Sequence, residues 1–149
     1  MSPLVINARN AALSTGLNVR RILPYMHRRM VGPFIFLDHA GPVTGYKSAH
    51  DFSSMDVLPH PHIGLTTVTY LLGGQVTHRD SLGIEQLIRQ GEVNWMTAGS
   101  GIAHSERFED PGLLAAGAME MLQTWVALPK EDEECTPDFV NYSPDELPI

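Results

Sequence analysis

The chain of 149 residues has a single cysteine, no long apolar run and a deficit of positive charge. Cys135 has no partner for an internal disulfide, which suits a reducing compartment, and we expect a cytoplasmic protein. Because no run of about 18 apolar residues is present, the sequence predicts no transmembrane helix. The first residues also lack a basic segment followed by an apolar one, so we expect no secretion signal. With 43% hydrophobic residues, the chain can still bury the core of a compact domain.

Charge is distributed unevenly along the chain. Residues 1–50 carry six Lys or Arg and one acid, a net charge of +5, whereas residues 51–149 carry four basic and sixteen acidic residues, a net charge of −12. The sum is −7, and this negative charge opposes phosphate binding. We therefore expect no direct binding to nucleic acid and interpret the basic residues as part of a solvated face.

Two short motifs each place two metal-binding residue types two positions apart. The first contains His60 and His62, and the second contains His104 and Glu106. On a β-strand this spacing puts both side chains on one face. Two such strands facing one interior would present three imidazoles and one carboxylate to a divalent transition metal, leaving positions for substrate, water or dioxygen. A lone His-x-His motif is more often part of a surface strand or turn, so the prediction depends on both motifs and their β-rich surroundings.

The middle of the chain predicts a succession of short β-strands. Residue types that favour strands are frequent in residues 65–72, 75–79, 84–89, 93–97 and 119–128. Glycines that mark turns recur at positions 74, 83, 91 and 99, eight or nine residues apart. Short strands separated by regularly spaced turns indicate a β-sandwich or barrel. No long amphipathic helix is expected.

Five segments carry a resemblance to a known family. They read GPFIFLDH at residues 32–39, HPHIG at 60–64 with the strand that follows, DSLG at 80–83, GEVNWMTAGSGIAHSE at 91–106 and QTWVALP at 123–129. Together they closely resemble the amino-terminal domain of the pirin family, a branch of the cupin superfamily, over roughly residues 16–130. The match is far more specific than a lone His-x-His motif.

The resemblance implies an all-β fold, the cupin double-stranded β-helix, which is a small β-barrel. It implies one pirin-like cupin domain over residues 1–130, followed at 131–149 by an acidic, proline-containing tail or linker where a second cupin domain normally follows. Carried over residue by residue, the family's metal ligands are His60, His62, His104 and Glu106. We expect one divalent transition metal per chain, with iron preferred over Mn, Ni, Co, Cu or Zn.

Other positions differ from the family or have competing interpretations. Glu120 and Met121 stand where many relatives are expected to have His-Gly, a change that would alter the rim of the pocket. We interpret His78 as a hydrogen-bonded surface residue rather than a ligand, and His39 and His50 as loop residues without a partner at ligand spacing.

Two classes of function are implied. Some pirins resemble quercetinases, so the protein is expected to be a quercetin 2,3-dioxygenase-like enzyme that cleaves a flavonol or related aromatic with dioxygen, with Glu106 as catalytic base. The alternative is a non-enzymatic metal- or redox-dependent regulatory protein, acting as a transcriptional cofactor or an enzyme-binding module. A first pirin domain alone would expose apolar surface, so we also expect a homodimer, formed through residues 125–129 and the tail.

Overall fold

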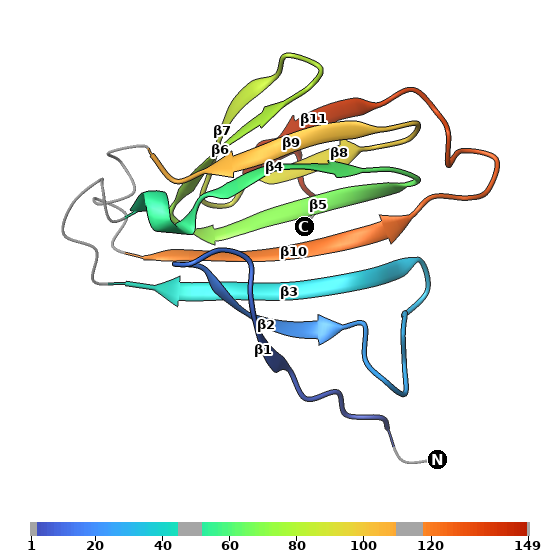
Figure 1. Ribbon diagram of the computed structural model, residues 1–149, viewed down its shortest axis with the longest axis horizontal. Helices are drawn as coiled ribbons and strands as arrows, with labels where there is room; N and C mark the ends of the chain where they lie inside the picture. Colours follow the sequence, from blue (N-terminus) through green and yellow to red (C-terminus); the bar gives the residue numbers. More distant parts are fainter. Residues whose placement is uncertain (1–2, 45–51, 110–117, 149) are drawn as a thin grey trace.

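The computed structural model describes residues 3–44, 52–109 and 118–148 of the chain, and most of its regular structure is β-strand (Figure 1). The strands within these ranges are β1 (Arg9–Ala12), β2 (Asn18–Leu23), β3 (Phe34–Val43), β4 (Val57–His62), β5 (Leu65–Gly73), β6 (Gln75–Asp80), β7 (Glu85–Arg89), β8 (Val93–Thr97), β9 (Ile102–Arg107), β10 (Met119–Ala127) and β11 (Asp138–Tyr142). Two 3-10 helices, η1 (Ser53–Met55) and η2 (Pro144–Glu146), accompany them. None of the helices in the described ranges is long and apolar enough to cross a membrane.

The strands form two antiparallel sheets. The larger sheet has the order β1-β2-β3-β10-β5-β8-β11, and the smaller has the order β4-β9-β6-β7 (Figure 1). Side chains of the two sheets meet in the interior: Gln123 of β10 donates a hydrogen bond to Glu106 of β9 over 3.1 Å. The sheets therefore pack face to face, as expected for the small β-barrel predicted from the sequence.

The predicted strands agree closely with the observed ones. The expected segments 65–72, 75–79, 84–89, 93–97 and 119–128 correspond to β5, β6, β7, β8 and β10. The turn after β5 needs a positive φ, and Gly74 supplies it with φ 82°, a conformation that residues with a side chain rarely adopt. Gly83 does the same between β6 and β7, with φ 85°.

One strand lies where the sequence indicated a tail. Residues 138–142 form β11, which pairs with β8 at the edge of the larger sheet, with Phe139 opposite Met96. Residues 130–134 are exposed, as expected for an acidic linker. The division of the chain into a domain and a tail stays a prediction, as does the homodimer, but residues 138–142 of the predicted tail take part in the sheet.

The inward-facing residues of β9 belong to apolar and polar layers of the interior. On β9 and the residue after it, Ile102, His104, Glu106 and Phe108 are all buried. Phe108 belongs to the larger apolar cluster, which also contains Leu17, Val19, Ala40, Phe52, Met55, Leu71, Val76, Ile88, Met119 and Met121. Ile102 belongs to a smaller cluster with Met96 and Ala98, packed against Phe139. The polar side chains His104 and Glu106 therefore lie between two apolar clusters.

Neighbouring leucines on β5 provide a test of this core. Leu71 is fully buried, whereas Leu72 points outward and is 37% exposed. We expect Leu71→Ala to lower the free energy of unfolding by about 2–5 kcal/mol, because it leaves a cavity in the larger cluster. Leu72→Ala removes the same atoms from the surface and should change it by only about 0.5 kcal/mol. Denaturant unfolding of both variants measures the difference, and equal effects would contradict the assigned strand faces.

Candidate metal centre

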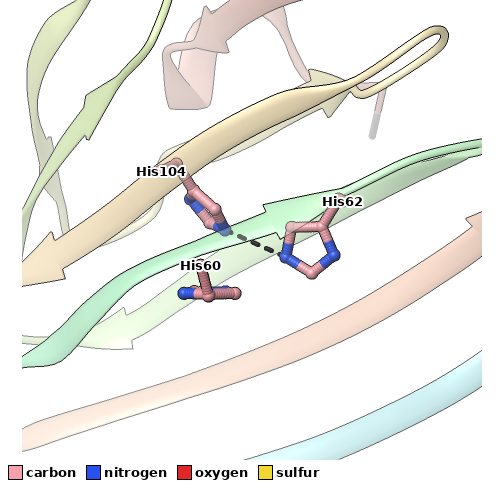
Figure 2. Close-up of side chains that lie close together, drawn as sticks. All are labelled: His60, His62 and His104. Carbon is pink, nitrogen blue, oxygen red and sulfur yellow. Dashed lines mark hydrogen bonds between the residues drawn. The ribbon is translucent and has the colours of Figure 1, made fainter.

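Pairing of β4 with β9 brings the two sequence motifs together. The strands are antiparallel, with His60 directly opposite His104. His62 lies two residues further along β4 and therefore shares the face of His60. The three imidazoles point toward one another from these two strands (Figure 2). One nitrogen from each ring lies within 4.8 Å of the other two, and His62 and His104 are buried while His60 is partly exposed.

The imidazole geometry fits a single metal ion. Nε2 of His62 and Nε2 of His104 are 3.1 Å apart. Two nitrogen ligands about 2.1 Å from one ion and at right angles to each other lie about 3.0 Å apart. His60 donates Nδ1–H to the carbonyl oxygen of Leu58 over 2.9 Å, so in the neutral tautomer of this ring the lone pair lies on Nε2, where a metal can bind.

Burial keeps two of the histidines neutral. Burial, together with a smaller contribution from the charge of His60, lowers the pKa of His62 to about 4. Burial likewise lowers the pKa of His104 to about 2, with contributions from His60, His78 and His62. Both rings are therefore neutral near pH 7, the form in which an imidazole binds a metal.

Glu106 lies beside the three histidines but outside the group within 4.8 Å. Its Oε1 is 4.0 Å from Nε2 of His104 and accepts the hydrogen bond from Gln123. Its Oε2 is buried and has no hydrogen-bond partner. A buried carboxylate oxygen without a partner is costly unless a proton or a cation neutralises it. The structure thus brings three of the four predicted ligands together, and the role of all four as metal ligands stays a prediction.

The same burial changes the acidity of Glu106. Desolvation raises the pKa of this carboxyl group, while the charge of His60 and the hydrogen bond from Gln123 act in the opposite direction. A carboxylate with a raised pKa is a stronger base than an exposed one. Glu106 is therefore suited to accept a proton inside the barrel.

A cavity of about 800 Å³ adjoins the histidines. His60, Glu106 and Gln123 contribute polar groups to its wall. Phe36 and Trp125 form an aromatic part of the same wall, with their rings stacked at a centroid distance of 4.1 Å and an angle of 14°. Trp125 also meets His62 edge to face at 5.2 Å, so the aromatic wall and the histidines are in contact. The cavity can accommodate a small aromatic molecule beside the centre.

Positively charged groups in the cavity wall are paired with acids. Arg21 lies 4.6 Å above the ring of Phe36 and forms two hydrogen bonds, of 2.9 and 2.8 Å, with buried Asp38. Arg107 similarly contacts Asp56 over 3.0 Å. Each of these two arginines is thus held in position by a carboxylate that balances its charge.

Two interpretations of other histidines need correction. His78 makes the expected hydrogen bond, to Asp80, but it is 3% exposed and is not a surface residue, because β6 pairs with β9 inside the barrel. His39 lies on β3 rather than in a loop, contacts Arg20 and bonds to Glu120 over 2.6 Å. His50 lies outside the described residues.

The unusual pair at positions 120–121 is divided between two environments. Glu120 pairs with His39, whereas Met121 is buried and lines the cavity. Of the two residues, Met121 is the one that contributes to the pocket wall, and the difference from relatives at these positions stays a prediction. Two further residues beside the histidines, Gln123 and Asp80, belong to segments that resemble the family, but the sequence alone predicts no role for either of them. The spacing of His78 and Asp80, two residues apart on one strand, was the signal available for the latter.

The fold of the chain is similar to those of solved bacterial proteins. A crystal structure of quercetin 2,3-dioxygenase from Acinetobacter baumannii superposes with a TM-score of 0.81 at 45% sequence identity, covering 93% of this chain and 44% of that one. The nickel(II) complex of the bacterial pirin YhhW from Escherichia coli has a TM-score of 0.66 at 21% identity, covering 91% of this chain and 54% of that one, a likeness of fold alone. The fold is that of the cupins, and the predicted all-β cupin barrel is confirmed.

The family follows from the sequence matches. The Pirin family model matches residues 16–126, and a pirin-like protein from Caulobacter vibrioides is 53% identical over 99% of this chain and 50% of its own length. The chain belongs to the pirin family, as its motifs predicted. It spans about half the length of the curated relatives it matches.

The neutral histidines predict how the metal-free protein responds to acid. A histidine whose pKa is about 6.5 when unfolded and lower when folded takes up its proton preferentially in the unfolded chain, so stability falls as pH drops below about 6.5. For His62 this loss continues to about pH 4, the pKa in the folded protein, and for His104 to about pH 2. Within its pH range, each histidine should lower the free energy of unfolding by about 1.4 kcal/mol for every unit by which the pH falls.

Unfolding by denaturant at pH 7 and pH 5, with a chelator present, measures this loss. His62→Gln removes one titrating group and should reduce the loss between the two pH values. An unchanged pH dependence in this variant would contradict the assigned state of His62.

Proposed function

We propose that the protein is a metal-dependent dioxygenase of the quercetinase type, acting on a flavonol or a related aromatic molecule. The observation that carries the proposal is the convergence of His60, His62 and His104 beside an aromatic cavity, with His60 in the cavity wall and His62 against Trp125. The name of the Acinetobacter baumannii structure, quercetin 2,3-dioxygenase, supports the choice of reaction.

In this proposal His60, His62, His104 and Glu106 hold one divalent transition metal, with iron preferred. Support comes from the 3.1 Å separation of two imidazole nitrogens and from Oε1 of Glu106, which lies 4.0 Å from Nε2 of His104. When bound, such an ion would supply Lewis acidity toward a substrate hydroxyl and redox chemistry toward dioxygen.

The cavity wall would position the substrate. Trp125 lies against Phe36 on one side and His62 on another, so an aromatic ring packed on this wall would come close to the histidines.

Glu106 would act as the base. The O–H bond of a substrate hydroxyl breaks, its proton moves to Oε2 of Glu106, and the electron pair stays on the substrate oxygen. Gln123 occupies Oε1 with its hydrogen bond and so leaves Oε2 as the oxygen available to the proton.

Metal binding provides the first test. The parent protein, purified and reloaded with iron(II), manganese(II) or nickel(II), should bind one ion per chain. His62→Ala should lose most of this metal and keep much of its β-structure, because the strand pairing does not depend on that side chain. Elemental analysis and circular dichroism measure the two properties. Stoichiometric metal in the double variant His60→Ala/His62→Ala would refute the proposed ligands.

Glu106→Gln tests the base. Glutamine keeps the size of the side chain and one amide oxygen but cannot accept the proton as a carboxylate does. Metal-loaded Glu106→Gln should retain some metal and lose turnover by about 100-fold or more, the usual contribution of a general base. The assay follows loss of the flavonol absorption band in air, with Glu120→Gln as a control that changes the same charge outside the cavity.

Undiminished turnover in metal-loaded Glu106→Gln would exclude a role as base. A metal-loaded parent without any flavonol turnover would contradict the proposed enzyme and would favour the regulatory class instead.

A further inference from the structure

Behind His104, on the side away from His62, lies a buried pair of polar side chains from β6. His78 is 3% exposed, and the side chain of Asp80 is completely buried. Pairing of β6 with β9 places Asp80 directly opposite His104 and His78 opposite Glu106. Both residues therefore face the interior, next to the proposed ligands, although neither belongs to the group of three converging histidines.

Asp80 has a fixed orientation because the turn after β6 holds one of its oxygens. Its Oδ1 accepts hydrogen bonds from the backbone N–H groups of Leu82 and Ile84, over 2.9 and 3.1 Å. Its Oδ2 lies 2.9 Å from Nε2 of His78. A carboxylate only accepts hydrogen bonds, so Nε2 of His78 carries a hydrogen and donates it. In a neutral imidazole the other nitrogen, Nδ1, is then an acceptor.

This assignment determines the hydrogen position on His104. Nδ1 of His104 is 3.3 Å from Nδ1 of His78. Because Nδ1 of His78 accepts, Nδ1 of His104 must donate, and the lone pair of His104 is left on Nε2. That nitrogen faces Nε2 of His62, 3.1 Å away, where the three imidazoles converge (Figure 2).

We propose that Asp80 and His78 are positioning residues that set the tautomer and ring orientation of His104, so that its Nε2 is free to bind the metal. The inference rests on the proposed metal centre and adds residues that do not themselves touch the ion. Hydrogen-bonded partners of this kind orient metal-binding histidines and raise their affinity for the ion.

The ring of His78 is also held by packing against strand β11. The ring of Phe139, on β11, stacks on His78 with a centroid distance of 4.4 Å and an angle of 20°. The position of His78 is thus determined by Asp80 through a hydrogen bond and by Phe139 through packing. A merely structural buried histidine would need its hydrogen bonds satisfied, but their direction would not matter to the metal.

Asp80→Asn tests the direction of the hydrogen bonds. The amide oxygen should stay on the two backbone N–H groups, which leaves the NH₂ group facing His78. Nε2 of His78 must then accept, its Nδ1 carries the hydrogen, and Nδ1 of His104 must accept in turn. The hydrogen of His104 moves to Nε2 and occupies the metal-binding lone pair. This nearly isosteric change should weaken nickel(II) binding about 10–100-fold, the usual effect of losing such a partner.

Two measurements read out the change. Imidazole ¹⁵N NMR of the metal-free protein should show His104 protonated on Nδ1 in the parent and on Nε2 in Asp80→Asn. Titration calorimetry with nickel(II) gives the affinities. Glu85→Gln is the matched control, because it removes one carboxylate from the adjacent strand at an exposed site that contacts Arg79. We expect its affinity to stay within about twofold of the parent, since it does not contact the histidines.

Substitutions of His78 keep the test decisive if Asp80→Asn fails to fold. Asparagine can place an amide oxygen near the position of Nδ1, whereas phenylalanine keeps the ring stacked on Phe139 and offers no acceptor. His78→Asn should therefore bind nickel(II) more tightly than His78→Phe. Where Asp80→Asn does fold, it should cause no further loss when added to His78→Phe.

The proposal is overturned if His104 keeps its tautomer and affinity in Asp80→Asn, or if His78→Phe binds as tightly as the parent. Failure of the proposed metal centre is a separate result. It would appear as absent stoichiometric nickel(II) binding in the parent, whereas the tautomer of His104 is measured without metal.

Discussion

The pairing of β4 with β9 is the constraint on which the site depends. Because His60 lies directly opposite His104, the two i, i+2 motifs fall on one interior face and within reach of one another. A shift of this register by one residue would turn the motif of one strand to the opposite face from the motif of the other, and the imidazoles could not converge. The remaining parts of the site, including the cavity wall on β10 and the pair on β6, are arranged around this strand pair.

A polar layer inside a small barrel is costly, and the structure offsets that cost in two ways. Apolar clusters lie on both sides of it, with Phe108 in one and Ile102 in the other, and their burial stabilises the barrel. Within the layer most polar groups are paired, as Gln123 is with Glu106 and Asp80 with His78. Oε2 of Glu106 and Nε1 of Trp125 are buried without such a partner, and Glu106 lies at the cavity wall where the proposed chemistry would use its free oxygen.

Much of the fold was predictable because its signals are local. Regularly spaced glycines and β-favouring residues correctly predicted the strands from residue 65 to 97, and the i, i+2 motifs correctly predicted that His60, His62 and His104 converge. The contacts that were missed join residues distant in sequence. Burial of His78 depends on β6 lying next to β9, and the strand at residues 138–142 forms only because β8 offers it an edge. Composition alone indicated a solvated tail there.

These non-local contacts explain how the histidines can be held ready for an ion. Electrostatic repulsion and desolvation oppose charged imidazoles in this space, so His62 and His104 stay neutral. Neutral rings can still rotate or change tautomer, and only a directional partner distinguishes their two nitrogens. Leu58 supplies that partner to His60 from its own strand, whereas His104 receives it from β6. Since Phe139 packs on His78, the C-terminal strand contributes to the arrangement of the site without lining the cavity.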